Sequence, residues 1–198
     1  MSKQFDAEYF DKWYRHPAHR VGTAADLERT VRFAVSAAEY ILARPILTVL
    51  DVGAGEGRWA PIIRRLRPRA QYHGVEPSSY ALARYGKRRN IVRGTTDDLD
   101  TLFPGRTFDL VVCCSVLNYL PRAAMTRALA QLARHTEGLA YLEIFTSADD
   151  VEGDTGGWHA EAPRNYRDFI RRAGFVACGL HCYIPQDHAE RTAALERA

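Results

Sequence analysis

The sequence predicts an α/β fold: a seven-stranded, mostly parallel sheet with helices on both faces and an antiparallel hairpin at its carboxyl end. Short β-rich apolar runs alternate with helical patterns between residues 46 and 145, which is typical of parallel βαβ units. A glycine cluster follows the first apolar run, as in a turn that joins a buried strand to a helix. Two further β-like runs near the carboxyl end lie close enough together to form the hairpin.

The first core element is a helix over residues 25–43, which Pro45 ends. Its apolar positions recur every three or four residues and form one buried stripe: Leu27, Val31, Val35, Ala38 and Leu42. A β-rich run over residues 46–50 then predicts the first strand, which stops at Asp51. The helix expected over residues 59–66 tolerates Pro61 because this residue lies in its first turn.

The same alternation continues along the chain. Strands are expected over residues 70–75, 91–92, 108–114 and 139–145, with helices over 79–85 and 122–135. After a loop over residues 149–157 that is rich in Gly and Asp, a helix near residues 166–173 precedes the β-like runs 175–180 and 182–184. Beyond Pro185 the chain is polar, and we expect it to fray.

Length and composition predict a single domain, since 198 residues of which 46% are hydrophobic can bury one sizeable core. We divide it into an aromatic leader over residues 1–24, a core over residues 25–185 and a polar tail over residues 186–198. The net charge of +3 indicates a mixed surface, so nucleic acid is not an expected partner on charge alone.

The cysteines favour a reducing compartment. Cys113, Cys114 and Cys178 lie in apolar runs, which suits buried thiols better than a disulfide framework. The amino terminus has no apolar stretch of signal-peptide length, and no uncharged run is long enough to span a membrane. We therefore expect a cytoplasmic protein with no membrane partner.

The glycine cluster at residues 53–57 suits a ligand-binding turn. Gly53, Gly55 and Gly57 allow a ligand to approach backbone N–H groups without a Cβ in the way. A dinucleotide-binding turn would place its third glycine at position 58, which is Arg58, so a pyrophosphate ligand is disfavoured. The next strand ends at Glu76, where a carboxylate can accept hydrogen bonds from both hydroxyls of a ribose. The alternative is a plain tight turn with a solvated acid nearby.

Three segments together resemble the class I S-adenosylmethionine-dependent methyltransferases: residues 49–58, residues 74–76 and residues 108–121. The resemblance spans residues 25–185 and implies a Rossmann-like fold, a bound S-adenosylmethionine that leaves as S-adenosylhomocysteine, and a small-molecule acceptor. A nucleic-acid amino-methyltransferase would be expected to carry an Asn/Asp-Pro-Pro-aromatic segment after the fourth strand, and this chain does not.

The resemblance also implies cofactor contacts for four segments. The glycine turn would contact the methionine part and the ribose, and the end of the second strand would hold the ribose. The loop after the third strand would contact adenine. The end of the fourth strand would contact the methionine part. The implied residues are Asp51, Gly53, Ala54, Gly55, Gly57, Glu76, Pro77, Thr96, Asp97, Asp98, Leu99, Cys114, Ser115 and Val116.

The adenine segment departs from the usual pattern of this family. An acid commonly follows the glycine directly, whereas Thr95 and Thr96 here precede Asp97 and Asp98. Either acid, or backbone amides of this stretch, could contact adenine. A Thr or Asp that caps a helix explains the same residues equally well.

Methyl transfer needs a positioned nucleophile and a place for its proton. His159 is the leading general-base candidate because it follows the flexible Gly156 and Gly157 after the fifth strand; the alternative is an exposed loop histidine. Asn118 and Tyr119 are expected to form a wall of the active site, where Asn118 can orient a substrate but cannot act as a base. Glu143, in an apolar strand, either lines the site or forms a salt bridge.

The aromatic leader is expected to cover the site, as in similar methyltransferases. Tyr9, Trp13 and Tyr14 would close over cofactor and acceptor and attract the sulfonium charge, and Arg15 or Arg20 would meet the cofactor carboxylate. A helix that simply packs on the body is the alternative. Two other functions stay open, a non-catalytic S-adenosylmethionine-binding module and a macromolecular acceptor, and no clustered ligands indicate a metal.

Overall fold

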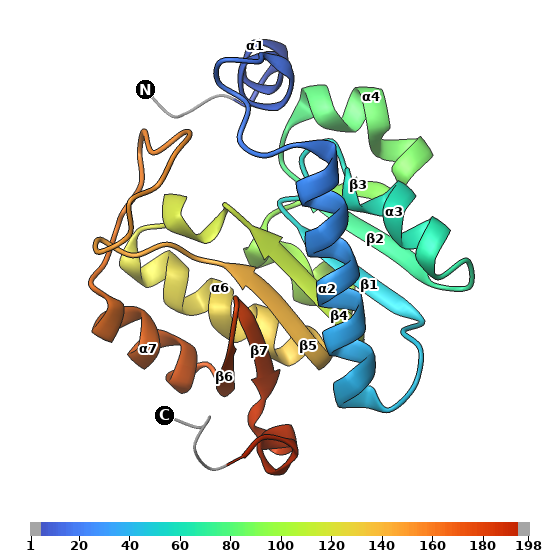
Figure 1. Ribbon diagram of the computed structural model, residues 1–198, viewed down its shortest axis with the longest axis vertical. Helices are drawn as coiled ribbons and strands as arrows, with labels where there is room; N and C mark the ends of the chain where they lie inside the picture. The colour runs from blue at the N-terminus through green and yellow to red at the C-terminus, as the bar shows by residue number, and fades with distance from the viewer. Residues whose placement is uncertain (1–4, 194–198) are drawn as a thin grey trace.

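The computed structural model describes residues 5–193 and contains one seven-stranded sheet in the order β3-β2-β1-β4-β5-β7-β6 (Figure 1). Five strands run parallel: β1 (Thr48–Val52), β2 (Gln71–Glu76), β3 (Ile91–Arg93), β4 (Phe108–Cys114) and β5 (Thr136–Glu143). The hairpin of β6 (Phe175–Gly179) and β7 (Cys182–Pro185) adds to β5 in antiparallel orientation. The predicted fold class is confirmed.

Helices cover both faces of the sheet. One face carries α2 (Ala24–Leu42) and α3 (Trp59–Leu66), whose apolar side chains pack on β1 and β4. The other face carries α6 (Arg122–His135) and α7 (Pro163–Arg172), together with the short α5 (Leu99–Leu102). A further helix, α4 (Ser79–Arg89), lies along β2 and β3. Because β4 is covered on both sides, nearly all of its residues are buried, and all of them except Asp109 are apolar.

Strand order reverses next to β1, since β2 and β3 lie on one side of it and β4 and β5 on the other. In open α/β sheets the carboxyl ends of the strands diverge at such a point and leave a crevice. The fold therefore places a binding site where β1, β2 and β4 end.

Several predicted boundaries shift by a few residues. The first strand starts at Thr48 instead of residue 46, and β5 covers Thr136–Glu143 instead of residues 139–145. The last helix begins three residues early because Pro163 occupies its first turn, where a missing N–H costs nothing. The tail prediction was wrong for residues 186–191, which form a 3₁₀ helix with Ala189 buried and with Arg191 donating to the Ile41 carbonyl; residues 194–198 lie outside the described part.

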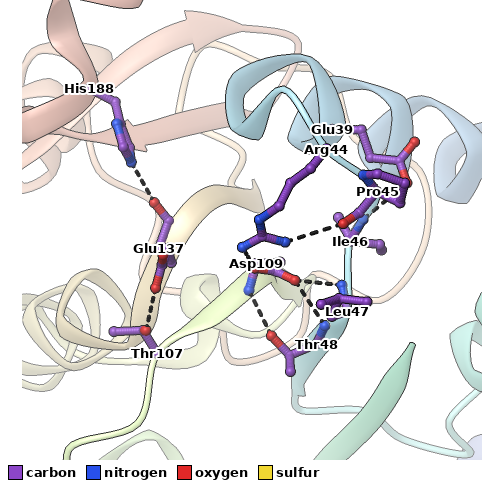
Figure 2. A network of polar contacts seen from close by, with 10 residues as sticks. All are labelled: Glu39, Arg44, Pro45, Ile46, Leu47, Thr48, Thr107, Asp109, Glu137 and His188. Carbon is purple, nitrogen blue, oxygen red and sulfur yellow. Dashed lines mark hydrogen bonds and ion pairs between the residues drawn. The ribbon is translucent and has the colours of Figure 1, made fainter. Parts of the chain in front are cut away.

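The late start of β1 has a clear cause at the amino end of the sheet (Figure 2). Asp109, buried near the start of β4, accepts hydrogen bonds from the Leu47 and Thr48 amides and from Arg44 at 2.6 Å. The Asp109 amide in turn donates to the Thr48 hydroxyl at 3.0 Å. These contacts hold residues 44–47 as a connection between α2 and β1, and the pairing of β1 with β2 begins at Thr48.

The leader forms the four-residue helix α1 (Ala7–Phe10) and one π-helical turn (Asp11–Arg15). Figure 1 shows α1 and the loop between β5 and α7 at the same end of the sheet. Phe10 is buried although it precedes the core in sequence. Within residues 5–193 no helix has the length and apolar character to cross a membrane.

Candidate functional site

A cavity of about 520 Å³ opens at the carboxyl ends of β1, β2 and β4. This volume lies within the range of small-molecule sites, about 300–1,000 Å³. Its lining comes from the glycine turn, the ends of β2, β4 and β5, the amino-terminal part of α2, the leader and the loop after β5. All three tryptophans of the chain, Trp13, Trp59 and Trp158, are among the lining residues.

The glycine turn adopts a conformation that side chains rarely tolerate. Gly53 and Gly55 have φ angles of 72° and 53°, and both line the cavity. A Cβ on Gly55 would lie 2.7 Å from the Tyr14 hydroxyl, and one on Gly53 would overlap Val116. Glycine is therefore required at both positions by backbone strain and by close neighbours.

Gly57 has a different role from the one expected. Its φ of 68° again favours glycine, but it does not line the cavity. A Cβ there would lie 2.7 Å from Ile91 Cδ1, so this glycine allows the turn to pack against β3. It shapes the turn and does not face the ligand space.

Glu76 is fixed against the glycine turn. Its side chain accepts hydrogen bonds from the Gly55 amide and the Ser78 amide, each at 2.8 Å. Glu76 is only 5% exposed, and burial raises the pKa of its carboxyl although both amides oppose this shift. Because each oxygen has a second lone pair, the carboxylate can also accept hydrogen bonds from a ligand in the cavity. Pro77, next in the chain, lines the cavity as well.

Asp51 and Ala54 also line the cavity. The Tyr72 hydroxyl donates to Asp51 at 2.5 Å from below the turn. Burial raises the pKa of Asp51 to about 7, an effect that Tyr72 opposes and the nearby Glu76 increases. Asp51 can thus hold a proton near neutral pH in the ligand-free protein.

The end of β4 contributes Cys114, Ser115 and Val116 to the lining, as expected. Ser115 has a φ of 55°, which turns the chain away from the strand. Its hydroxyl donates to Glu143 at 2.6 Å, and Glu143 itself lines the cavity at the end of β5. Of the two expectations for Glu143, the structure favours the cavity wall, since no ion pair of Glu143 occurs within residues 5–193.

The loop after β3 meets the cavity with fewer residues than expected. Thr95 and Thr96 line it, whereas Asp97, Asp98 and Leu99 do not. Asp98 accepts from the Thr95 amide at 2.8 Å in a capping box, which is the helix-cap alternative. Asp97 pairs with Arg127 at 3.4 Å on the surface. Leu99 is fully buried in the core.

Asn118 lies behind the cavity and not on its wall. It is fully buried, donates to the Phe145 carbonyl at 2.6 Å and accepts from the Phe145 amide at 3.1 Å. Its own carbonyl accepts from the His159 amide at 2.8 Å. Asn118 thus ties the end of β4 to the loop after β5, which is a positioning role.

Tyr119 lines the cavity, and its hydroxyl donates to the Asp154 carbonyl at 2.8 Å. His159 does not lie with it. The His159 side chain is exposed and outside the lining residues. The structure therefore does not bring the leading base candidate to the site.

The leader lies over the glycine turn, with Tyr9, Trp13 and Tyr14 in the cavity lining. Burial, followed by the charge of Glu76, raises the pKa of Tyr14, in keeping with its place above the turn. Arg15 does not face the cavity: it pairs with Glu56 of the turn and with Asp11 at 2.6 Å. Arg20 is exposed and outside the lining.

Sequence reasoning missed several lining residues. Arg58, considered only as a missing glycine, lines the cavity and lies 5.4 Å from the Tyr14 ring centre. Phe145, Asp154 and Trp158 also line it. The sequence did contain a signal for Trp158. It is a large aromatic residue in a loop rich in Gly and Asp, and such a side chain is more stable in a cavity than in solvent.

The sheet is mostly parallel, a glycine turn follows its first strand, a buried acid ends its second, and a cavity lies between them. This combination is typical of α/β proteins that bind nucleotide cofactors. The family model described as a methyltransferase domain matches residues 14–178. This chain belongs to the methyltransferase-domain family.

Solved structures show the same fold. A magnesium protoporphyrin IX methyltransferase from Synechocystis PCC 6803 with bound S-adenosylmethionine is 20% identical, with a TM-score of 0.59 over 87% of this chain and 84% of that one. An amino pentose methyltransferase from Micromonospora echinaspora is 19% identical, with a TM-score of 0.55 over 81% and 88%. An S-adenosylmethionine-dependent methyltransferase from Archaeoglobus fulgidus is 13% identical, with a TM-score of 0.62 over 85% and 73%. A search of curated proteins finds no match.

Proposed function

We propose that this protein transfers a methyl group from S-adenosylmethionine to a small-molecule acceptor by in-line displacement. The observation that carries the proposal is the contact between Glu76 and Gly55, which joins the ribose-type acid to the glycine turn at one wall of the cavity. Similar structures hold S-adenosylmethionine or S-adenosylhomocysteine, which supports the same donor here.

The residues proposed to hold the donor are those that line its half of the cavity. Glu76 would bind the ribose hydroxyls, and the turn at Gly53 and Gly55 would lie against the ribose and methionine part. Thr96 would border adenine, and Ser115 would border the methionine part. Arg58 is the basic lining residue that can pair with the cofactor carboxylate, a role first considered for Arg15 or Arg20.

The chemistry of methyl transfer requires mainly alignment of three atoms, the nucleophile, the methyl carbon and the sulfur. The leader, which lies over the turn, and the loop after β5 both line the cavity, so they can exclude water and hold the acceptor. A cavity of about 520 Å³ supports a small acceptor over a macromolecule. All four cysteines are free thiols, which supports the proposed cytoplasmic location.

Calorimetric titration tests the donor. We expect S-adenosylhomocysteine to bind and NAD not to bind, because Arg58 stands where a pyrophosphate turn needs glycine. Release of S-adenosylhomocysteine from S-adenosylmethionine in the presence of a metabolite panel then tests catalysis. Binding of NAD alone would overturn the proposal, and binding without turnover across the panel would favour the non-catalytic module.

A further inference from the structure

The cavity is acidic, although the whole chain carries a net charge of +3. Among the described lining residues Arg58 is the one basic side chain, against six acids: Asp26, Asp51, Glu76, Glu143, Glu152 and Asp154. A cavity lined by one sign of charge concentrates ligands of the opposite sign. Asp26 pairs with Arg29, which is outside the lining, and Asp51 and Glu76 lie on the glycine-turn side. Three acids, Glu143, Glu152 and Asp154, thus lie at the end of β5 and in the loop after it.

The wall on the β4–β5 side is aromatic. The Tyr119 and Trp158 rings meet edge to face at 6.0 Å, and Phe145 stacks on Trp158 at 6.0 Å with an interplanar angle of 9°. Phe5 of the leader meets Tyr119 at 5.9 Å. Aromatic faces attract cations, most strongly where water is excluded.

Two carboxylates stand beside this aromatic wall. Glu143 accepts a hydrogen bond from Ser115, a neutral hydroxyl that orients the carboxylate without neutralising it. The Tyr119 hydroxyl, which donates to the Asp154 carbonyl, also lies 3.2 Å from a carboxylate oxygen of Asp154. Each acid is therefore fixed by a residue that itself lines the cavity.

The same wall holds a polar atom that a ligand would complete. The indole N–H of Trp158 is buried and has no hydrogen-bond partner within residues 5–193. Buried donors are nearly always paired in folded proteins, so this N–H points to a ligand with an acceptor atom. An ammonium group has no acceptor, so this atom belongs to another part of the ligand.

We propose that the methyl acceptor is an amine, which binds as an ammonium group between the aromatic wall and the carboxylates of Glu143 and Asp154. This inference rests on the proposed function. Before transfer the ammonium releases one proton to solvent water. The nitrogen lone pair then forms the N–C bond while the S–C bond breaks, and its electron pair returns to sulfur as S-adenosylhomocysteine forms.

The test compares a cation with its neutral isostere. Choline and 3,3-dimethylbutan-1-ol have the same shape and differ in the charge of one atom, so their dissociation constants isolate recognition of charge. Both are titrated calorimetrically into the wild-type protein saturated with S-adenosylhomocysteine. We expect choline to bind about tenfold tighter or better, as cation–π contacts and a carboxylate predict.

Variants locate the effect. Glu143→Gln and Trp158→Leu should each reduce the choline preference several-fold, while S-adenosylhomocysteine affinity shows that the variant is folded. Asp168→Asn removes an exposed acid of α7 that pairs with Arg171, and it should leave the preference unchanged.

The outcomes separate the two proposals. Equal affinity for the two probes in a protein that binds S-adenosylhomocysteine overturns the amine inference and leaves the proposed function standing. Choline preference without S-adenosylhomocysteine binding overturns the proposed function instead. A preference that survives both cavity substitutions also overturns the assignment of the amine to this wall.

Discussion

Glu76 illustrates how one side chain can shape a site and still be available to a ligand. Its hydrogen bonds from Gly55 and Ser78 hold the turn and the start of α4 in place. The carboxylate is nearly buried, yet it lines the cavity. A ligand hydroxyl that reaches it makes a charge-assisted hydrogen bond in a site with little competing water.

The Glu76→Ala variant should weaken S-adenosylhomocysteine binding by about 1–3 kcal/mol, because charge-assisted hydrogen bonds to the ribose hydroxyls are lost. Calorimetric dissociation constants measure this loss, with Glu190→Ala, an exposed acid outside the cavity, as the control. A circular dichroism spectrum confirms that the variant is folded. Unchanged affinity in a folded Glu76 variant would remove this residue from the donor site.

At the scale of elements, the two ends of the sheet have separate roles. The carboxyl ends carry the cavity, whereas the amino ends carry the polar contacts of Asp109 (Figure 2). Burial alone would raise the pKa of Asp109, but Arg44 and the amides of Leu47 and Thr48 outweigh it and hold this pKa below its usual value. Asp109 is thus a charged anchor for the connection between α2 and β1.

The Asp109→Asn variant should lower the free energy of unfolding by about 2–3 kcal/mol, because a buried charged acceptor of several hydrogen bonds is lost. The Kd for S-adenosylhomocysteine should change little, since the anchor lies at the opposite end of the sheet. Urea unfolding and calorimetry measure the two quantities. Asp168→Asn is the control and should change stability by less than about 1 kcal/mol; an equal effect of both substitutions would contradict the anchor.

Sequence periodicity was sufficient for the regular elements. The helices Trp59–Leu66 and Arg122–His135 and the strand Phe108–Cys114 have the predicted boundaries, because each is packed with one face or both in the core. Local pattern could not reveal that Asp109, 61 residues away from Thr48, delays the start of β1. It also could not reveal that the leader crosses the turn, since contact between Tyr14 and Gly55 depends on tertiary packing.

The residues of the candidate site that lie at the ends of strands could be predicted from the sequence. The glycines at 53 and 55, Glu76 and Ser115 lie where a strand ends, and a strand end can be read from sequence. His159 and Trp158 are neighbours in a loop. Loop side chains follow no fixed period, so the sequence does not reveal which of the two points into the cavity. Sequence reasoning chose the histidine, whereas the structure brings the tryptophan into the cavity.

At the scale of the whole molecule, Asp51 in the cavity lining contributes to the pH dependence of the free energy of unfolding. An acid whose pKa rises from 3.8 to about 7 on folding keeps its proton in the folded state after the unfolded state has released it. The contribution of Asp51 to the free energy of unfolding therefore falls as pH rises from about 4 to 7, by an amount of the order of 4 kcal/mol, and levels off above that range.

The Asp51→Asn variant should remove this dependence. We expect its stability relative to wild type to be about 3 kcal/mol more favourable at pH 8 than at pH 5, measured by urea unfolding of the ligand-free protein. Constant effects of the substitution, such as a changed hydrogen bond with Tyr72, cancel in this difference. Parallel stability profiles for the two proteins would show that Asp51 is ionised throughout.

The placement of Trp13, Trp59 and Trp158 gives the molecule a built-in optical reporter. Because these are all the tryptophans that the chain contains, its intrinsic indole emission arises entirely at the cavity wall. Three distinct segments contribute, namely the leader, the start of α3 and the loop after β5. Emission from unlabelled protein thus reads out the state of the cavity, and single-tryptophan variants would resolve which segment responds to each ligand.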